Sequence, residues 1–120
     1  IPDSVTSIGG YAFNGCSSLT SVTIPDSVTE IGEGAFQYCY SLKSVTIPDS
    51  VTEIGYRAFY GCSSLTSVYC KATTPPVGDA DMFYKNASGR KIYVPMESVE
   101  AYKSAYRWSD YADDIVGYNF

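Results

Sequence analysis

A 23-residue unit repeats three times without a gap at the start of the chain, beginning at Ile1, Ile24 and Ile47. Fifteen of the 23 positions carry the same residue in all three copies. A period of about 20–50 residues is typical of a solenoid, in which each unit buries its apolar face against its neighbours. The repeat therefore predicts a stack of similar coils, and it indicates that the shared residues serve stacking.

The end of each unit predicts a short β-strand. In the pattern L-x-x-V-x-I, the apolar Val22 and Ile24 alternate with polar residues, which is the period of a strand with one buried face. Pro25 follows, and proline ends the strand because it has no N–H to donate to a ladder. Since the copies of this strand lie one coil apart, we expect them to pair as a parallel sheet.

The other part of each unit predicts an inward-facing arc. Ala35, Phe36 and Cys39 have the spacing at which one helical turn directs all three side chains inward. Together with the strand, this arc gives eight buried positions per unit. In the second copy they are Val28, Ile31, Ala35, Phe36, Cys39, Leu42, Val45 and Ile47.

Small and hydroxylated residues recur at fixed places in the arc. A glycine occupies one position in every copy, as Gly9, Gly32 and Gly55, which suggests a positive φ or a close approach between coils. The hydroxyl groups of Ser27 and Thr29, and of their copies, are candidates to satisfy backbone groups in the turn.

Composition argues against several classes of partner and chemistry. The net charge is −5 and the longest basic cluster is Arg90-Lys91, whereas nucleic acids and anionic membranes require clustered cations. No apolar run approaches the roughly 20 residues that span a bilayer. The chain has no His, the commonest general base and zinc nitrogen ligand. We expect a non-enzymatic protein with no cofactor, no metal, no nucleic-acid partner and no membrane insertion.

Three cysteines are spaced one repeat apart, at Cys16, Cys39 and Cys62. Metal sites favour close pairs such as C-x-x-C, which are absent. Side chains stacked in register point the same way, which disfavours the roughly ±90° dihedral of a disulfide. We therefore expect a buried spine of free thiols, with Cys70 as a further small core residue, over the alternatives of disulfides or a metal ladder.

Carboxylates also recur once per coil. A glycosidase needs two carboxylates in one cleft, whereas these form rows of single sign along the outer side of the coils. We expect a solvated acidic row, with weak divalent-cation binding as the alternative. The row consists of Asp3, Asp26, Asp49, Glu30 and Glu53.

The repeat resembles the BspA-like subclass of leucine-rich repeats. The motif C-x-x-L-x-x-V-x-I-P-x-S-V-T-x-I-G-x-x-A-F-x-x-C runs from Cys16 to Cys39 and again from Cys39 to Cys62. The resemblance implies an α/β fold, a curved right-handed solenoid with its parallel strand ladder on the concave side. It also implies secreted or cell-surface proteins of host-associated bacteria, often adhesive, and it supplies no catalytic residues.

The remainder of the chain is similar to the C-terminal cap that closes such arrays. We expect one structural domain, with repeats at 1–23, 24–46 and 47–69, the start of a further strand at 70, and a cap over 71–120. Within the cap we predict an irregular excursion over 71–90 with one turn at 81–84, a strand over 91–94 and a helix over 97–106. Trp108, Tyr111 and Ile115 are expected to cover the last coil, with a final strand over 113–117. A separate small domain is the alternative.

The chain opens in register with the repeat, so we expect it to be part of a longer protein, with an uncovered face on the first unit. The candidate ligand surface is the polar side of the strand ladder, which solenoids commonly use for binding. Its residues are Ser21, Thr23, Lys43, Ser44, Thr46, Ser67 and Tyr69. Positions that differ between copies, such as Tyr11/Gly34/Arg57 and Thr23/Thr46/Tyr69, are where recognition would differ between coils.

Three functions remain open from the sequence. The first is a monomeric surface recognition or adhesion module that binds a protein, such as one of a host's extracellular matrix, or a glycan. The second is a structural spacer or stalk for another domain. The third is carbohydrate binding through the aromatic residues of the tail, Tyr102, Tyr106, Trp108 and Tyr111.

Overall fold

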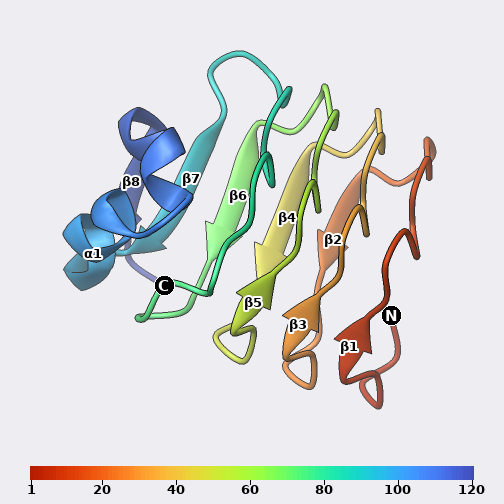
Figure 1. Ribbon diagram of the computed structural model, residues 1–120, viewed down its shortest axis with the longest axis horizontal. Coiled ribbons are helices and arrows are strands. Elements are labelled where there is room, and N and C mark those ends of the chain that lie inside the picture. The colour runs from red at the N-terminus through yellow and green to blue at the C-terminus, as the bar shows by residue number, and fades with distance from the viewer.

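The computed structural model describes residues 1–120 as a stack of coils with two parallel sheets running along it (Figure 1). The smaller sheet has the order β1-β3-β5. Its strands are β1 Ser7–Ile8, β3 Glu30–Ile31 and β5 Glu53–Ile54. The larger sheet has the order β2-β4-β6-β7-β8. Its strands are β2 Ser21–Thr23, β4 Ser44–Ile47, β6 Ser67–Cys70, β7 Lys91–Pro95 and β8 Ile115–Tyr118.

The predicted parallel ladder is confirmed, with equivalent repeat positions facing each other across the larger sheet. Val22 pairs with Val45, and Val45 pairs with Val68. The strands of the smaller sheet are not evident from the sequence, because a Glu-Ile pair is too short to show alternation. Each of the three repeats therefore contributes to two sheets, and the core lies between them.

The core is built from columns of identical residues, one per coil. All eight positions predicted as buried in the second copy are at most 1% exposed. The rings of Phe13, Phe36, Phe59 and Phe83 stack with centroids 5.1, 5.1 and 5.5 Å apart and interplanar angles of 10° or less. The arc that carries them consists of turns, so the predicted helical turn is absent although its side chains do point inward.

Polar groups inside the stack bond to the preceding coil. The Cys39 thiol donates to the Phe13 carbonyl at 3.2 Å, and the Cys62 thiol donates to the Phe36 carbonyl at 3.1 Å. The Ser27 hydroxyl similarly donates to a backbone carbonyl one coil away, at 2.6 Å. The predicted role of the hydroxyl groups is confirmed, with the difference that they join neighbouring coils.

The recurrent glycine marks a close approach between coils, which confirms one of the two expectations for this position. A Cβ on Gly32 would lie 2.8 Å from backbone atoms of the first coil, and one on Gly55 would lie 2.7 Å from the Glu33 nitrogen. Neither residue has a positive φ, and a Cβ on the equivalent Gly9 would meet nothing within 4 Å. The stack therefore requires this glycine wherever a coil precedes it.

Positive φ occurs instead at two positions that vary between copies. One is occupied by Tyr11, Gly34 and Arg57, and the other by Gly15, Tyr38 and Gly61. The two positions are complementary, since a Cβ on Gly34 would lie 2.5 Å from the Tyr11 ring and one on Gly61 would lie 2.6 Å from the Tyr38 ring. Each tyrosine thus lies over the glycine of the next coil.

Residues 71–90 form a further coil where we expected an irregular excursion. Phe83 extends the phenylalanine column, and Asn86 donates to the Phe59 carbonyl at 2.9 Å, as the cysteines do in earlier coils. The turn expected at 81–84 is present. The coil is one residue longer than the others, because Ser67 pairs with Lys91. The division into repeats that end at residue 70 and a cap over residues 71–120 stays a prediction.

The C-terminal segment contains η1 Met96–Ser98, α1 Val99–Ser104 and η2 Trp108–Asp114, at the end of the stack far from β1 (Figure 1). The helix predicted over 97–106 ends two residues early, because Ala105 is extended. Tyr106 is consequently 72% exposed, where the helical pattern had aligned it with Val99 and Tyr102. The strand predicted over 91–94 includes Pro95, and the final strand is Ile115–Tyr118.

Trp108, Tyr111 and Ile115 are buried against the last coil, as predicted. The Trp108 ring lies 5.7 Å from Phe83, at the end of the phenylalanine column, and its N–H donates to the Pro76 carbonyl at 2.8 Å. The Tyr111 hydroxyl accepts from the Phe83 N–H at 3.1 Å. These contacts close the column and satisfy backbone groups that a further coil would otherwise bond.

The glycine at the coil contact can be tested with a matched pair. We expect Gly55→Ala to lower the free energy of unfolding by about 1–3 kcal/mol, because its methyl group meets backbone that has to move. Gly9→Ala, at the same repeat position with open space, should change it by less than about 0.5 kcal/mol. Urea denaturation followed by circular dichroism measures both; equal effects would contradict the close-approach explanation.

The covering role of Trp108 gives a second test. Trp108→Ala removes a fully buried side chain and should cost about 3–5 kcal/mol of unfolding free energy. Tyr106→Ala, which truncates an exposed aromatic residue of the same segment, is the control and should leave the urea midpoint nearly unchanged. A folded Trp108→Ala protein with an unchanged free energy of unfolding would show that the segment does not close the stack.

Candidate functional site

The outer face of the larger sheet brings the predicted surface residues together in rows. Ser21, Ser44 and Ser67 are paired in register across β2, β4 and β6. Thr23, Thr46 and Tyr69 form the next row. Lys43 directly precedes β4 and is exposed. All seven side chains are exposed or half-buried, whereas the alternate residues of the same strands are buried.

Hydroxyl groups on this face differ from those elsewhere in the repeat. Those of Thr29 and Thr52 each donate to the carbonyl of the equivalent residue one coil earlier, at 3.2 Å. Ser27 and Ser50 bond in the same way, at 2.6 and 2.7 Å. The hydroxyl groups of the two rows on the larger sheet make no hydrogen bond within the protein, so their donors and acceptors are available to a ligand.

Aromatic side chains gather at the C-terminal end of this face. Tyr69 and Tyr93 stack with centroids 4.9 Å apart at an interplanar angle of 14°. Tyr118 meets both rings edge-on, at 5.5 and 5.4 Å, and Phe120 lies 4.8 Å from Tyr118. We call these four residues the aromatic cluster. Tyr118 and Phe120 are 42% and 48% exposed.

The strands of this face lack acidic residues although the chain is acidic overall; Glu97 lies just beyond them, in a hollow shared with Lys71, Tyr118 and Phe120. None of the 13 acidic residues lies in the five strands of the larger sheet. Lys91 begins β7, Lys71 follows β6, and both are exposed. Arg90, the other half of the basic pair, is buried and bonded to Asp114 at 2.7 Å. The face therefore favours a neutral or anionic ligand.

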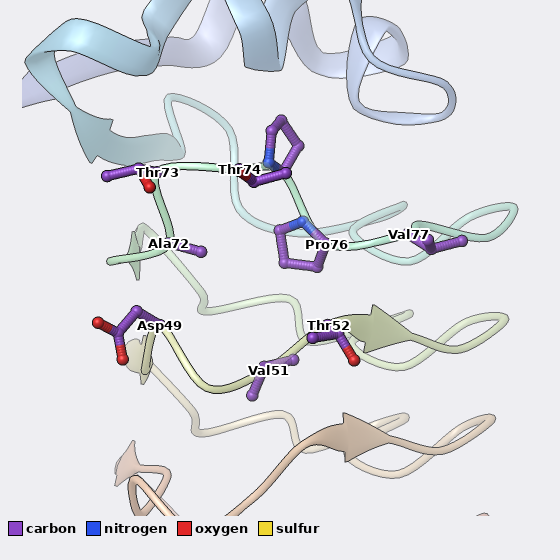
Figure 2. Close-up of a pocket in the computed structure, with 9 residues that line it drawn as sticks. Asp49, Val51, Thr52, Ala72, Thr73, Thr74, Pro76 and Val77 are labelled. Carbon is purple, nitrogen blue, oxygen red and sulfur yellow. The ribbon is translucent and has the colours of Figure 1, made fainter.

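Two further hollows lie near these groups. One of about 390 Å³ is lined by Thr23, Thr46, Tyr69, Lys71, Tyr118 and Phe120. The larger, of about 450 Å³, lies between residues 49–52 of the third coil and residues 72–77 (Figure 2). Beside it, the carbonyls of Thr73 and Pro76 accept hydrogen bonds from Ser98 and Trp108 of the C-terminal segment. Asp49 is its one carboxylate, so it holds no acid–base pair.

Reactive groups are not assembled at any of these places. Hydrogen bonding to Cys39 and burial raise the pKa of the Cys62 thiol, and burial raises that of Cys70 to about 11, so neither is a ready nucleophile. All four cysteines are free, and Cys16 is the one that is half-exposed. No three side chains come together that could hold a metal ion. The five recurrent carboxylates are exposed, with Glu30 beside Glu53 across the smaller sheet.

The tail aromatics considered for carbohydrate binding are mostly core residues. Tyr102 and Trp108 are fully buried and Tyr111 is 9% exposed, which leaves only Tyr106 accessible. The Tyr102 hydroxyl donates to the Ala72 carbonyl at 2.6 Å, and burial raises its pKa. These four residues therefore form no shared surface. Other exposed aromatics lie in the turns, as Tyr40 does, and at the C-terminal end of the larger sheet, as Tyr118 and Phe120 do.

Sequence reasoning missed Tyr93, Tyr118, Phe120, Lys71 and Lys91 on this face. Tyr93 could have been found, because a strand over 91–94 was expected to stack on the third coil. Tyr118 could not have been found, because its place on this face depends on where β8 ends and on the pairing of Tyr118 with Pro95.

Comparison with known proteins identifies the repeat. The model of the BspA-type leucine-rich repeat region matches residues 1–112 in six copies, well beyond the three near-identical units. No curated protein matches the chain. None of the helices has the length and apolar composition of a membrane span. Leucine-rich repeats of this kind are generally non-enzymatic interaction scaffolds or surface modules. The chain belongs to the BspA-type leucine-rich repeat family.

Proposed function

We propose that this chain is a non-enzymatic recognition module, secreted or displayed at a bacterial cell surface, that binds through the outer face of the larger sheet. Its partner is a protein, such as one of a host's extracellular matrix, or a glycan. In this proposal the stack is a right-handed solenoid and the binding face is its concave side. The residues that carry binding are those of the two hydroxyl rows together with Lys43.

One observation carries the proposal. The hydroxyl groups on the larger sheet lie in register and are free of internal hydrogen bonds, whereas equivalent groups on the other side are used to join coils. Regular rows of free donors and acceptors on a rigid scaffold need no reorganisation before they bind, which reduces the entropic cost of association. Tyr and Ser are also the residues that dominate many recognition surfaces.

A second candidate is a spacer that holds another domain away from the surface. The continuous phenylalanine column from Phe13 to Phe83 supports it, because close packing along the whole stack resists bending. A spacer needs no free polar rows, however. The two functions therefore differ in whether the sheet face has to be intact.

The test is a binding screen against extracellular-matrix proteins and an array of glycans. Ser44→Arg places a bulky side chain in the middle of the serine row and should reduce binding to any ligand found at least tenfold. Ser63→Arg is the matched control, since it makes the same change at an exposed position outside the sheet and should bind normally. Absence of any ligand, or equal loss in both variants, would favour the spacer.

A further inference from the structure

We propose that the aromatic cluster and its hollow form a saccharide-binding subsite, with preference for a sugar that carries a carboxylate. This inference rests on the proposed function and names the ligand chemistry at one end of its binding face. The observations that support it are the ring geometry, the free hydroxyl groups, the flanking lysines and the size of the hollow.

The cluster presents aromatic surface that the core does not use. Tyr69 and Tyr93 are half-buried and stacked on each other, while Tyr118 stands nearly perpendicular to both. Tyr69 and Tyr93 each cover one face of the other ring, so the rings that line the hollow are those of Tyr69, Tyr118 and Phe120. Aromatic faces are electron-rich and attract the polarised C–H groups that line one side of a pyranose ring.

The polar groups around the hollow match the rim of a sugar. Thr23 and Thr46 line the hollow, and their hydroxyl groups make no internal hydrogen bond. The hydroxyl groups of Tyr69 and Tyr118 are likewise without a partner in the protein. A sugar ring combines an apolar face with a rim of hydroxyl groups, so it can pack on the rings and bond to the threonine row at the same time.

The charges select among saccharides. Lys71 lines the hollow and Lys91 stands at the start of β7, the strand that carries Tyr93. An ammonium group beside the rings repels a cationic ligand, which argues against use of the cluster as a cation–π site. A carboxylate on the sugar would instead pair with Lys71. The preference is therefore for an acidic sugar over a neutral one of the same length.

Size and hydrogen-bonding capacity favour a saccharide over a protein segment. The hollow is wide open to solvent and is lined by six residues, whereas a protein partner needs about 800 Å² of surface. A peptide strand is recognised by backbone groups at a sheet edge. Here the face of the sheet is exposed, and its polar groups are side-chain hydroxyls.

The experiment uses the whole chain and two hexasaccharide probes, a hyaluronan fragment that contains glucuronate and the neutral chitohexaose. Titration followed by amide NMR should shift signals of β6, β7 and β8, with the hyaluronan fragment binding at least fivefold more tightly. Saturation transfer from tyrosine ring protons to sugar C–H groups reports the stacking directly. Unchanged spectra with both probes at millimolar concentration would overturn the inference.

Variants separate the contributions of ring and charge. Tyr118→Ala should weaken binding of both probes at least tenfold, while Tyr40→Ala, at a somewhat more exposed tyrosine outside the cluster, should not change it. Lys71→Gln should bring hyaluronan binding down to the chitohexaose level and leave chitohexaose unaffected. Fluorescence of the single, buried Trp108 checks that each variant is folded. Equal effects of Tyr118→Ala and Tyr40→Ala would contradict the subsite.

A third probe distinguishes failure of this inference from failure of the proposed function. A short peptide of alternating glutamate and tyrosine shares the charge and aromatic character of an acidic protein segment. If it shifts the same strands while both saccharides do not, the sheet face is a recognition surface and the saccharide subsite is wrong. If none of the probes shifts the sheet and the wider screen finds no ligand, both proposals fail.

Discussion

Equivalent residues stack on one another at the separation of one coil, and this contact organises the fold. The phenylalanine rings lie 5.1–5.5 Å apart and nearly parallel, which is possible only if each coil repeats the path of the one before. A unit of 23 residues buries too little apolar surface to fold alone, so stability comes from contacts between coils. Most of its 15 constant positions serve these contacts: they face the core, join neighbouring coils or, as at Gly32 and Gly55, leave room for the adjacent backbone. The exposed aspartate row and the serine row of the larger sheet are constant without such a contact.

The same constraint explains how the array ends. The fourth coil has an extra residue and different side chains, yet it keeps Phe83 in the column and uses Asn86 where the earlier coils use cysteine. Trp108 then terminates the column at an angle of 51° to Phe83, a geometry that cannot be continued by another parallel ring. The hollow beside Thr73 and Pro76 arises where the carbonyls of this coil turn to the C-terminal segment.

The candidate binding surface consists of residues whose side chains are not used in stacking the coils. Serine and threonine occur on both sides of each coil. Those near the smaller sheet bond to the preceding coil, whereas those within the strands of the larger sheet remain free; Thr66, just before β6, donates to the Lys43 carbonyl. One row of the larger sheet also changes along the stack, since Thr23 and Thr46 are followed by Tyr69 and then Tyr93. The row is therefore polar in the first two coils and aromatic at its C-terminal end, where lysines lie nearby although the chain is acidic overall.

The repeat architecture, the parallel ladder, the buried positions and the rows of the candidate surface follow from the sequence, because a period that recurs three times specifies which residues align. Where positive φ falls, how residues 71–90 form a coil and which aromatics are accessible depend on tertiary packing. The tail shows the reason most clearly. Helical spacing aligned Tyr106 with Tyr102, but α1 ends at Ser104 and separates them, while Tyr118 joins Tyr69 and Tyr93 through strand pairing across 49 and 25 residues of chain. Contacts between segments that share no repeat are set by how the chain packs, and no local pattern encodes them.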